Sequence, residues 1–126
     1  MRAVDTNVLV RLIARDDAKQ VAAAEAFIAE GAWVSTLALA EATWVLSSAY
    51  ELDQRRISIA VAMLTEHRHL VLQDPDVVSA ALGRLRARPS LGFSDCLLVE
   101  LARKAGHLPL GTFDRDLAKL DGAVRI

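Results

Sequence analysis

Four acidic residues stand where a carboxylate could do chemistry. Asp5 interrupts AVDTNVLV, Glu41 interrupts LALAEATW and Asp95 interrupts GFSDCLLV, and all three stretches are apolar. Asp114 follows another apolar stretch, LPLGTF. Burying a carboxylate without a partner costs several kcal/mol, so each position needs either solvent or a compensating group.

Taken singly, each acid has an ordinary structural explanation. Asp5 is suited to cap a helix, and Asp95 to stabilise the positive end of a helix dipole. Asp114 is a common turn residue, and Glu41 is able to pair with an arginine. Taken together, carboxylates that converge on one pocket repel one another unless a cation neutralises them or one of them keeps its proton. Carboxylate oxygens without His or Cys suit Mg²⁺ or Mn²⁺ better than zinc, so the acids predict a site for a hard divalent cation.

The elements that must position these acids alternate between strands and helices. Punctuating residues divide the chain, most clearly Asp74-Pro75 at one helix start, Ser94 as the cap of the next helix, and Gly106 at its end. The predicted strands are residues 2–4, 32–35, 69–73, 108–112 and 124–126. The predicted helices are residues 7–14, 17–29, 37–50, 54–66, 75–86, 94–104 and 114–120. This alternation is typical of an α/β domain in which helices cover both faces of a parallel sheet.

Such a sheet offers one place where the four acids can meet. Ligand sites in open parallel sheets form beyond the carboxyl ends of the strands, where the strand order reverses. Asp5 and Asp114 each follow a predicted strand, whereas Glu41 and Asp95 lie near the beginnings of helices. If the strands before Asp5 and Asp114 are neighbours, we expect the carboxylates to share one crevice.

Composition and charge limit the possible functions. The chain has 126 residues, 53% of them hydrophobic and 25% charged, which suits one domain spanning residues 1–126. A formal net charge of −1 argues against a protein that grips nucleic acid by overall charge. Cys96 is the only cysteine, which excludes an internal disulfide and fits a reducing cytoplasm. No uncharged apolar run approaches the ~18 residues of a transmembrane helix, and Asp5 interrupts the stretch that a signal peptide needs. We therefore expect a cytoplasmic protein without membrane contact.

Three segments of the chain resemble the PIN-domain ribonucleases, and specifically the VapC-like toxins of type II toxin–antitoxin pairs. They are VDTNVLVRLI, STLALAEATWVL and FSDCLLVELARKAGHLPLGTFDRDLAKL. The family pattern is an Asp in a D-T/S-N context, a Glu on the helix after the second strand, an Asp opening a later helix, and an Asp after a T-F pair. Asp5, Glu41, Asp95 and Asp114 match that pattern in order. The resemblance implies a doubly wound parallel sheet with strand order 3-2-1-4-5, in which the first and fourth strands are neighbours.

The resemblance also implies an activity, namely Mg²⁺-dependent hydrolysis of RNA phosphodiester bonds by an endoribonuclease, with Mn²⁺ as a possible substitute. A metal-bound water is a source of hydroxide near neutral pH. In this interpretation the catalytic residues and metal ligands are Asp5, Glu41, Asp95 and Asp114. Supporting polar residues are expected at Asn7, Ser94, Thr112 and Asp116. Arg11 and Arg115 follow the acids closely and are candidates for binding RNA phosphates.

Partners follow from the resemblance alone. VapC-like toxins usually self-associate, so a homodimer is expected. They are neutralised by a VapB-like antitoxin, whose amphipathic segment lies against helices that correspond here to residues 17–29 and 54–66. An arginine from such a partner would be able to occupy the acidic pocket by charge pairing.

Two other functions are compatible with acids at strand ends. A haloacid-dehalogenase-like phosphatase also begins with such an Asp, but its second Asp, two residues later, is replaced here by Asn7. A non-catalytic signalling or binding domain with an acidic pocket needs a phospho-acceptor Asp after the third strand. Asp74 is the candidate for that role, although its place before Pro75 is more typical of a helix start.

Overall fold

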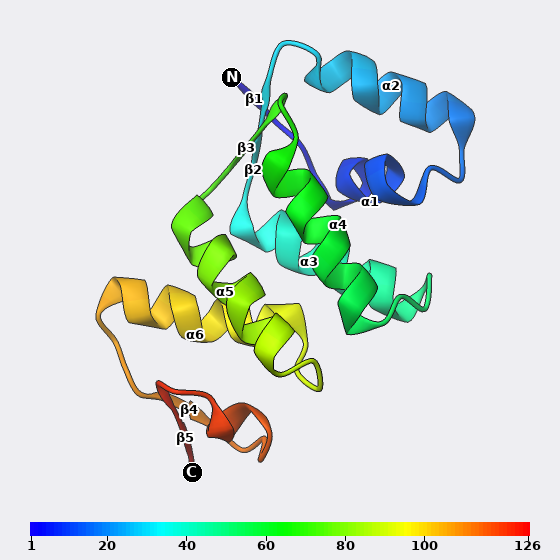
Figure 1. The fold of residues 1–126 in the computed structure, drawn as a ribbon. Helices are drawn as coiled ribbons and strands as arrows, with labels where there is room; N and C mark the ends of the chain where they lie inside the picture. Colours follow the sequence, from blue (N-terminus) through cyan, green and yellow to red (C-terminus); the bar gives the residue numbers. More distant parts are fainter.

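Strands and helices alternate along the chain in the computed structural model, which describes every residue from 1 to 126 (Figure 1). The strands are Arg2–Ala3 (β1), Ala32–Val34 (β2), Leu70–Leu72 (β3), Leu110–Thr112 (β4) and Ala123–Arg125 (β5). The α-helices are Thr6–Ala14 (α1), Ala18–Ile28 (α2), Thr36–Ser48 (α3), Gln54–Glu66 (α4), Pro75–Ala87 (α5) and Phe93–Ala105 (α6), and Leu117–Lys119 is a short 3₁₀ helix (η1). The α/β class and the element order predicted from the sequence are confirmed.

Polar side chains begin four of the helices. Asp5, Asp17, Ser35 and Asp53 each accept a hydrogen bond from the backbone N–H of the residue three positions further on. These bonds satisfy N–H groups that have no partner inside the helix. Asp5 therefore caps α1, as its ordinary structural explanation predicts, because its Oδ1 atom lies 3.2 Å from the Val8 nitrogen.

One predicted cap is wrong, and another helix start lacks the side-chain hydrogen bond of a cap. Helix α6 begins at Phe93, after Gly92, so Ser94 lies inside the first turn and cannot cap it. Asp74 precedes Pro75 as expected, but it adopts a left-handed conformation with a φ of 46° and makes no capping bond. Its carboxylate instead accepts a hydrogen bond from Lys104 Nζ at 2.8 Å, an ion pair with the far end of α6 that sequence spacing does not reveal.

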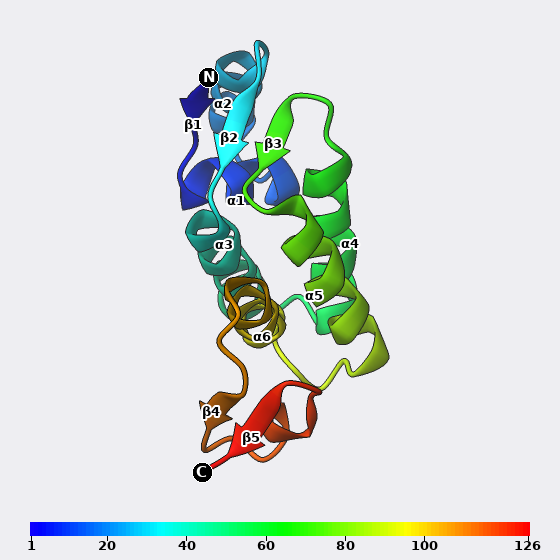
Figure 2. The same ribbon diagram turned by 90° about the vertical axis from the view of Figure 1, so that its left-hand side faces the viewer.

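The strands form two separate parallel sheets. One has the order β1-β2-β3, and the other pairs β4 with β5. The predicted single sheet of order 3-2-1-4-5 is therefore not confirmed, because the junction between β1 and β4 is not formed within the chain. The cause lies in α6, which packs against α3 and α5 and delivers β4 to the opposite end of the molecule from β1 (Figures 1 and 2).

Helices cover only one face of the three-stranded sheet, contrary to the prediction of two covered faces. Helices α1 and α2 lie behind that sheet in Figure 2, and no helix crosses the face towards the viewer. Ala3, Trp33 and Val71 are partners across the three strands. Trp33 is 38% exposed and Val71 50% exposed, as expected for an uncovered face.

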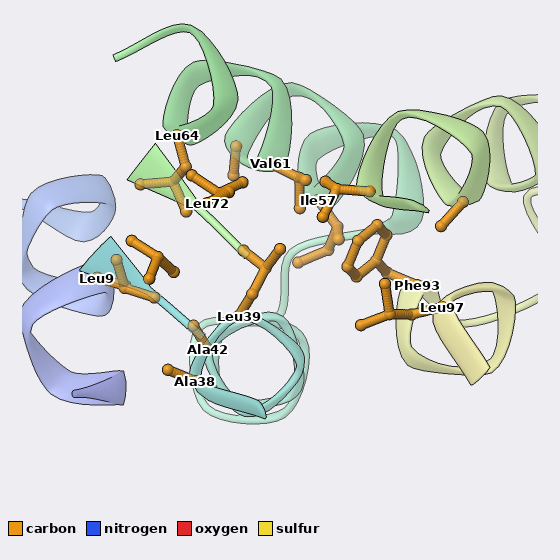
Figure 3. Close-up of a cluster of buried hydrophobic side chains, with 14 of the residues drawn as sticks. Leu9, Ala38, Leu39, Ala42, Ile57, Val61, Leu64, Leu72, Phe93 and Leu97 are labelled. Atoms are coloured by element: carbon orange, nitrogen blue, oxygen red, sulfur yellow. The ribbon is translucent and has the colours of Figure 1, made fainter. Parts of the chain in front are cut away.

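One hydrophobic core joins the two halves of the chain. Ile57 and Val61 of α4 face Leu39 of α3, and Phe93 and Leu97 of α6 fill the neighbouring space (Figure 3). This cluster of 30 buried residues fixes α5 and α6 against α3 and α4, and so fixes where β4 begins. None of the helices is both long and apolar enough to cross a lipid bilayer.

Candidate active site

The first pair of candidate acids lies where the N-terminus of α1 meets α3. Asp5 ends the chain segment that leaves β1, and Glu41 lies on α3 one turn after its start. Thr6 connects them, because its Oγ1 donates a hydrogen bond to Glu41 Oε2 at 2.9 Å. Asp5 and Glu41 are both solvent-exposed, so water, rather than a protein cation, solvates their charges.

The second pair comes from α6 and the loop after β4. Asp95 is half-buried in the first turn of α6, where a carboxylate is favoured by the helix dipole. Burial is the largest cause that raises the pKa of Asp95 above its usual range, and the neighbouring Asp114 carboxylate raises it further. A backbone hydrogen bond with Gly92 opposes the shift. The carboxylates of Asp95 and Asp114 are therefore close enough to repel one another.

Hydrogen bonds hold the Asp114 side chain in place. Its Oδ1 atom accepts the backbone N–H of Asp116 at 2.8 Å and that of Leu117 at 3.1 Å. Thr112 Oγ1 accepts the backbone N–H of Asp114 at 3.0 Å. Thr112 thus supports the loop that presents Asp114.

The two pairs do not meet within one chain. No three side chains of the types His, Cys, Asp or Glu lie close enough together to hold a metal ion. None of the four acids forms an ion pair with a Lys or Arg side chain either. Oxygen donors suit Mg²⁺ or Mn²⁺ by chemistry, but a single chain in this arrangement does not fit such an ion, because each place offers at most two carboxylates.

Comparison with known proteins adds the family. The family model described as PIN domain matches residues 2–123. This chain belongs to the PIN-domain family. The family is typically one of nucleases, which generally depend on divalent metal ions. Comparisons with curated proteins and with solved structures found no match.

Two of the other polar residues singled out in this PIN domain, Asn7 and Ser94, line surface hollows. Asn7 is exposed and lines a surface hollow of about 340 Å³ between α1 and α2, to which none of the four acids contributes. Ser94 lines a small hollow between α6 and the ends of α3 and α4, beside Trp44 and Gln54.

Asp116 belongs to a separate network around the loop after α5. It accepts hydrogen bonds from Ser90 Oγ at 2.6 Å and from Arg88 Nη1 at 3.4 Å. The hydrogen bond from Ser90 is the main cause that holds the pKa of Asp116 below its usual range, and Arg88 adds to the effect. The Asp116 carboxylate thus has hydrogen-bond partners of its own, while its backbone N–H donates to Asp114 and helps to hold that loop.

The two arginines predicted to bind RNA phosphates differ in whether their side chains already have hydrogen-bond partners. Arg11 donates hydrogen bonds to Gln20, to Tyr50 Oη at 2.9 Å and to Asp16 Oδ1 at 3.2 Å. Its guanidinium is occupied by that network, which argues against a role in binding phosphate. Arg115, directly after Asp114, is exposed and has no hydrogen-bond or ion-pair partner in the PIN domain.

Sequence reasoning missed one buried acid of this PIN domain. Glu100 is 5% exposed and accepts hydrogen bonds from Arg84 Nε at 3.1 Å and from Arg103 Nε at 3.2 Å. The signal was present in CLLVELARK, where a Glu interrupts an apolar run three residues before an Arg. Glu100 joins α5 to α6, and Cys96, one turn earlier, has a thiol whose pKa burial raises to about 11, which fits an inert packing residue.

Proposed function

We propose that this PIN domain is an endoribonuclease that hydrolyses RNA phosphodiester bonds with the help of Mg²⁺ or Mn²⁺. The observation that carries the proposal is the set of four carboxylates, Asp5, Glu41, Asp95 and Asp114, which match the family pattern and have no cation partner in the chain. The buried acid Glu100, by contrast, is paired with Arg84 and Arg103. Unpaired acids that lie at strand ends and helix starts are suited to a ligand of positive charge.

The proposed roles differ between the two acid pairs. Asp5 and Glu41, coupled through Thr6, form an exposed acidic edge on the β1 side. Asp95 and Asp114 form a second edge, in which burial and then the neighbouring Asp114 carboxylate raise the pKa of Asp95. All four are proposed as catalytic residues and, where the two pairs are brought together, as ligands of the divalent cation. Arg115 is proposed to bind a phosphate of the RNA, because it is free and adjoins Asp114.

We further propose that the chain acts as the toxin of a toxin–antitoxin pair in the cytoplasm. The support lies in α4, where Ile57, Ala60 and Leu64 are buried while Ile59 and Met63 are exposed one turn apart. Two apolar side chains at this spacing suit the apolar face of an amphipathic segment from a VapB-like antitoxin. Co-purification of the chain with such a protein, lost on changing Ile59 and Met63 to Ser, tests this role.

The ribonuclease proposal is tested by incubating purified protein with a mixed RNA pool in Mg²⁺, in Mn²⁺ and in chelator, and mapping the cut ends. We expect internal cleavage that requires the metal. Asp5→Asn is expected to reduce the rate at least ~100-fold while circular dichroism and Tm remain close to those of the wild type, since Asn retains a capping oxygen.

The matched control is Glu30→Gln, which neutralises an exposed acid outside the four and should leave the rate unchanged. Full activity of folded Asp5→Asn with metal present would overturn the assignment of Asp5. Release of phosphate from small phosphoesters without RNA cleavage would replace the ribonuclease by a phosphatase.

A further inference from the structure

The two sheets of this chain leave complementary edges without partners. β1 pairs only with β2, and β4 pairs only with β5. The Val4 N–H donates to Trp33, and the Leu110 N–H donates to Gly122. Because N–H groups alternate between the two sides of a strand, the N–H groups of Ala3 and Gly111 face the open edges. Free edges of this kind are templates for pairing with another strand.

Both sheets are also less buried than parallel sheets normally are. Parallel sheets occur almost only with both faces covered, and an isolated two-stranded sheet is marginally stable. Here Trp33 and Val71 are exposed on the three-stranded sheet. On the β4–β5 side, Phe113 is 79% exposed and Ile126 is 69% exposed. Each sheet therefore has apolar surface as well as backbone groups available for an added layer.

The candidate catalytic acids are divided in the same way as the sheets. Asp5 follows β1 and is coupled to Glu41, whereas Asp114 follows β4 and lies near Asp95. In a parallel pair of strands the carboxyl ends lie at the same edge. Pairing of β1 with a β4 strand would thus place the residues that follow them, Asp5 and Asp114, side by side.

A chain cannot make this junction itself without breaking its core. Leu117, the first residue of η1, and Leu120, directly after it, belong to the same buried cluster as Phe93 and Leu97. That cluster includes Ile57 of α4 (Figure 3), and it holds the β4–β5 sheet at the end of the molecule remote from β1 (Figure 2). A second copy is able to reach the open β1 edge while both cores stay intact.

We propose that two copies of this chain complete each other, with β4 of one copy paired in parallel to β1 of the other. The result is a two-fold dimer with two five-stranded sheets of order 3-2-1-4-5, in each of which the last two strands belong to the second copy. Each active site is then composite, and combines Asp5 and Glu41 of one copy with Asp95 and Asp114 of the other. The grouping of the acids rests on the proposed ribonuclease, whereas the strand pairing rests on the open edges.

Complementation between inactive variants tests the composite site. Asp5→Asn and Asp114→Asn chains are co-expressed with different affinity tags, and the mixed dimer is isolated by two successive purifications. One of its two sites contains both substitutions and the other contains neither, so we expect about half of the wild-type RNA cleavage rate, against losses of at least ~100-fold for each parent.

The matched control combines Asp5→Asn with Glu41→Gln, which lie on the same side of the junction. Every site of that mixed dimer carries one substitution, so no activity should return. Absence of recovery in the Asp5→Asn and Asp114→Asn dimer, or full activity of a wild-type monomer, would overturn the proposal.

A second measurement is independent of RNA cleavage. Light scattering is expected to give the mass of a dimer for the wild type and of a monomer for Ala3→Pro, which removes the N–H at the open β1 edge but none that β2 uses. The control is Ala18→Pro, because proline is tolerated at the first residue of a helix and Ala18 begins α2. This variant should remain dimeric. A wild type that is monomeric, or an Ala3→Pro variant that is still dimeric, would contradict the strand exchange. A wild-type dimer that loses its dimeric state on Ala3→Pro but cuts no RNA would contradict only the ribonuclease.

Discussion

Asp95 combines a proposed catalytic role with a position that disfavours its charged form. It is half-buried, lies near the Asp114 carboxylate and has no cation beside it, and the first two of these conditions raise its pKa. An ionised carboxylate in such a place lowers the stability of the fold. Groups of this kind are concentrated at functional sites, where the cost is tolerated for the sake of the chemistry.

The raised pKa of Asp95 predicts how stability depends on pH in the absence of metal. The folded protein binds this proton more tightly than the unfolded chain does, so the stabilisation is complete below the unfolded pKa of about 4. It is lost as the pH rises through the higher folded pKa. Asp95→Asn should remove this pH dependence and raise the Tm at neutral pH, while it abolishes RNA cleavage. Thermal unfolding in chelator across the acidic range measures the effect, and a lower Tm for Asp95→Asn at neutral pH would contradict it.

At the level of elements, α6 determines which groups come together. Its buried face, with Phe93 and Leu97, packs against α3 and α4 (Figure 3), and its carboxyl end leads into the β4–β5 sheet. Glu100 ties the same helix to α5 through Arg84. The helix therefore sets the position of Asp95 at one end and of β4 at the other.

Removal of the Phe93 ring should show how much this packing contributes. Phe93 is 2% exposed, so Phe93→Ala is expected to lower the free energy of unfolding by about 3–5 kcal/mol. Leu98→Ala is the matched control on the same helix, because Leu98 is 52% exposed and its truncation should change the value by less than ~0.5 kcal/mol. Denaturant unfolding measures both, and equal effects would mean that α6 does not pack as described.

For the whole molecule, the decisive feature is that exposed apolar surface and open strand edges occur together. Trp33, Val71, Phe113 and Ile126 are exposed on or beside the two sheets. A second copy that supplies the missing strand neighbours would convert part of this surface into interface. Assembly would then contribute to the stability of each copy.

Linked assembly and folding predict a Tm that depends on protein concentration. The wild-type Tm should rise as the concentration increases, because mass action favours the folded dimer. The Tm of Ala3→Pro should be lower and independent of concentration, since its β1 edge lacks a donor. Differential scanning calorimetry over a hundredfold range of concentration provides the comparison. A wild-type Tm that does not change with concentration would count against the dimer.

The sequence by itself determined the elements of this protein and the identity of its acids. Pro75 at a helix start and Gly106 as a helix end are local signals, and such signals predicted the order of strands and helices correctly. The PIN-domain resemblance was likewise readable from Asp5 and the other acids in their short motifs, and the family model confirmed it. Local signals suffice here because capping and amphipathic burial involve residues within a few positions of each other.

Only the tertiary structure decided which of those elements meet. The ion pair of Asp74 with Lys104 and the packing of α6 on α3 involve residues far apart in sequence, so the spacing of residues could not predict them. The same packing separated β4 from β1, and with them Asp114 from Asp5. Strand order depends on which of several similar apolar faces pack against one another. That packing involves all the elements of the core together, so no single segment of sequence determines it.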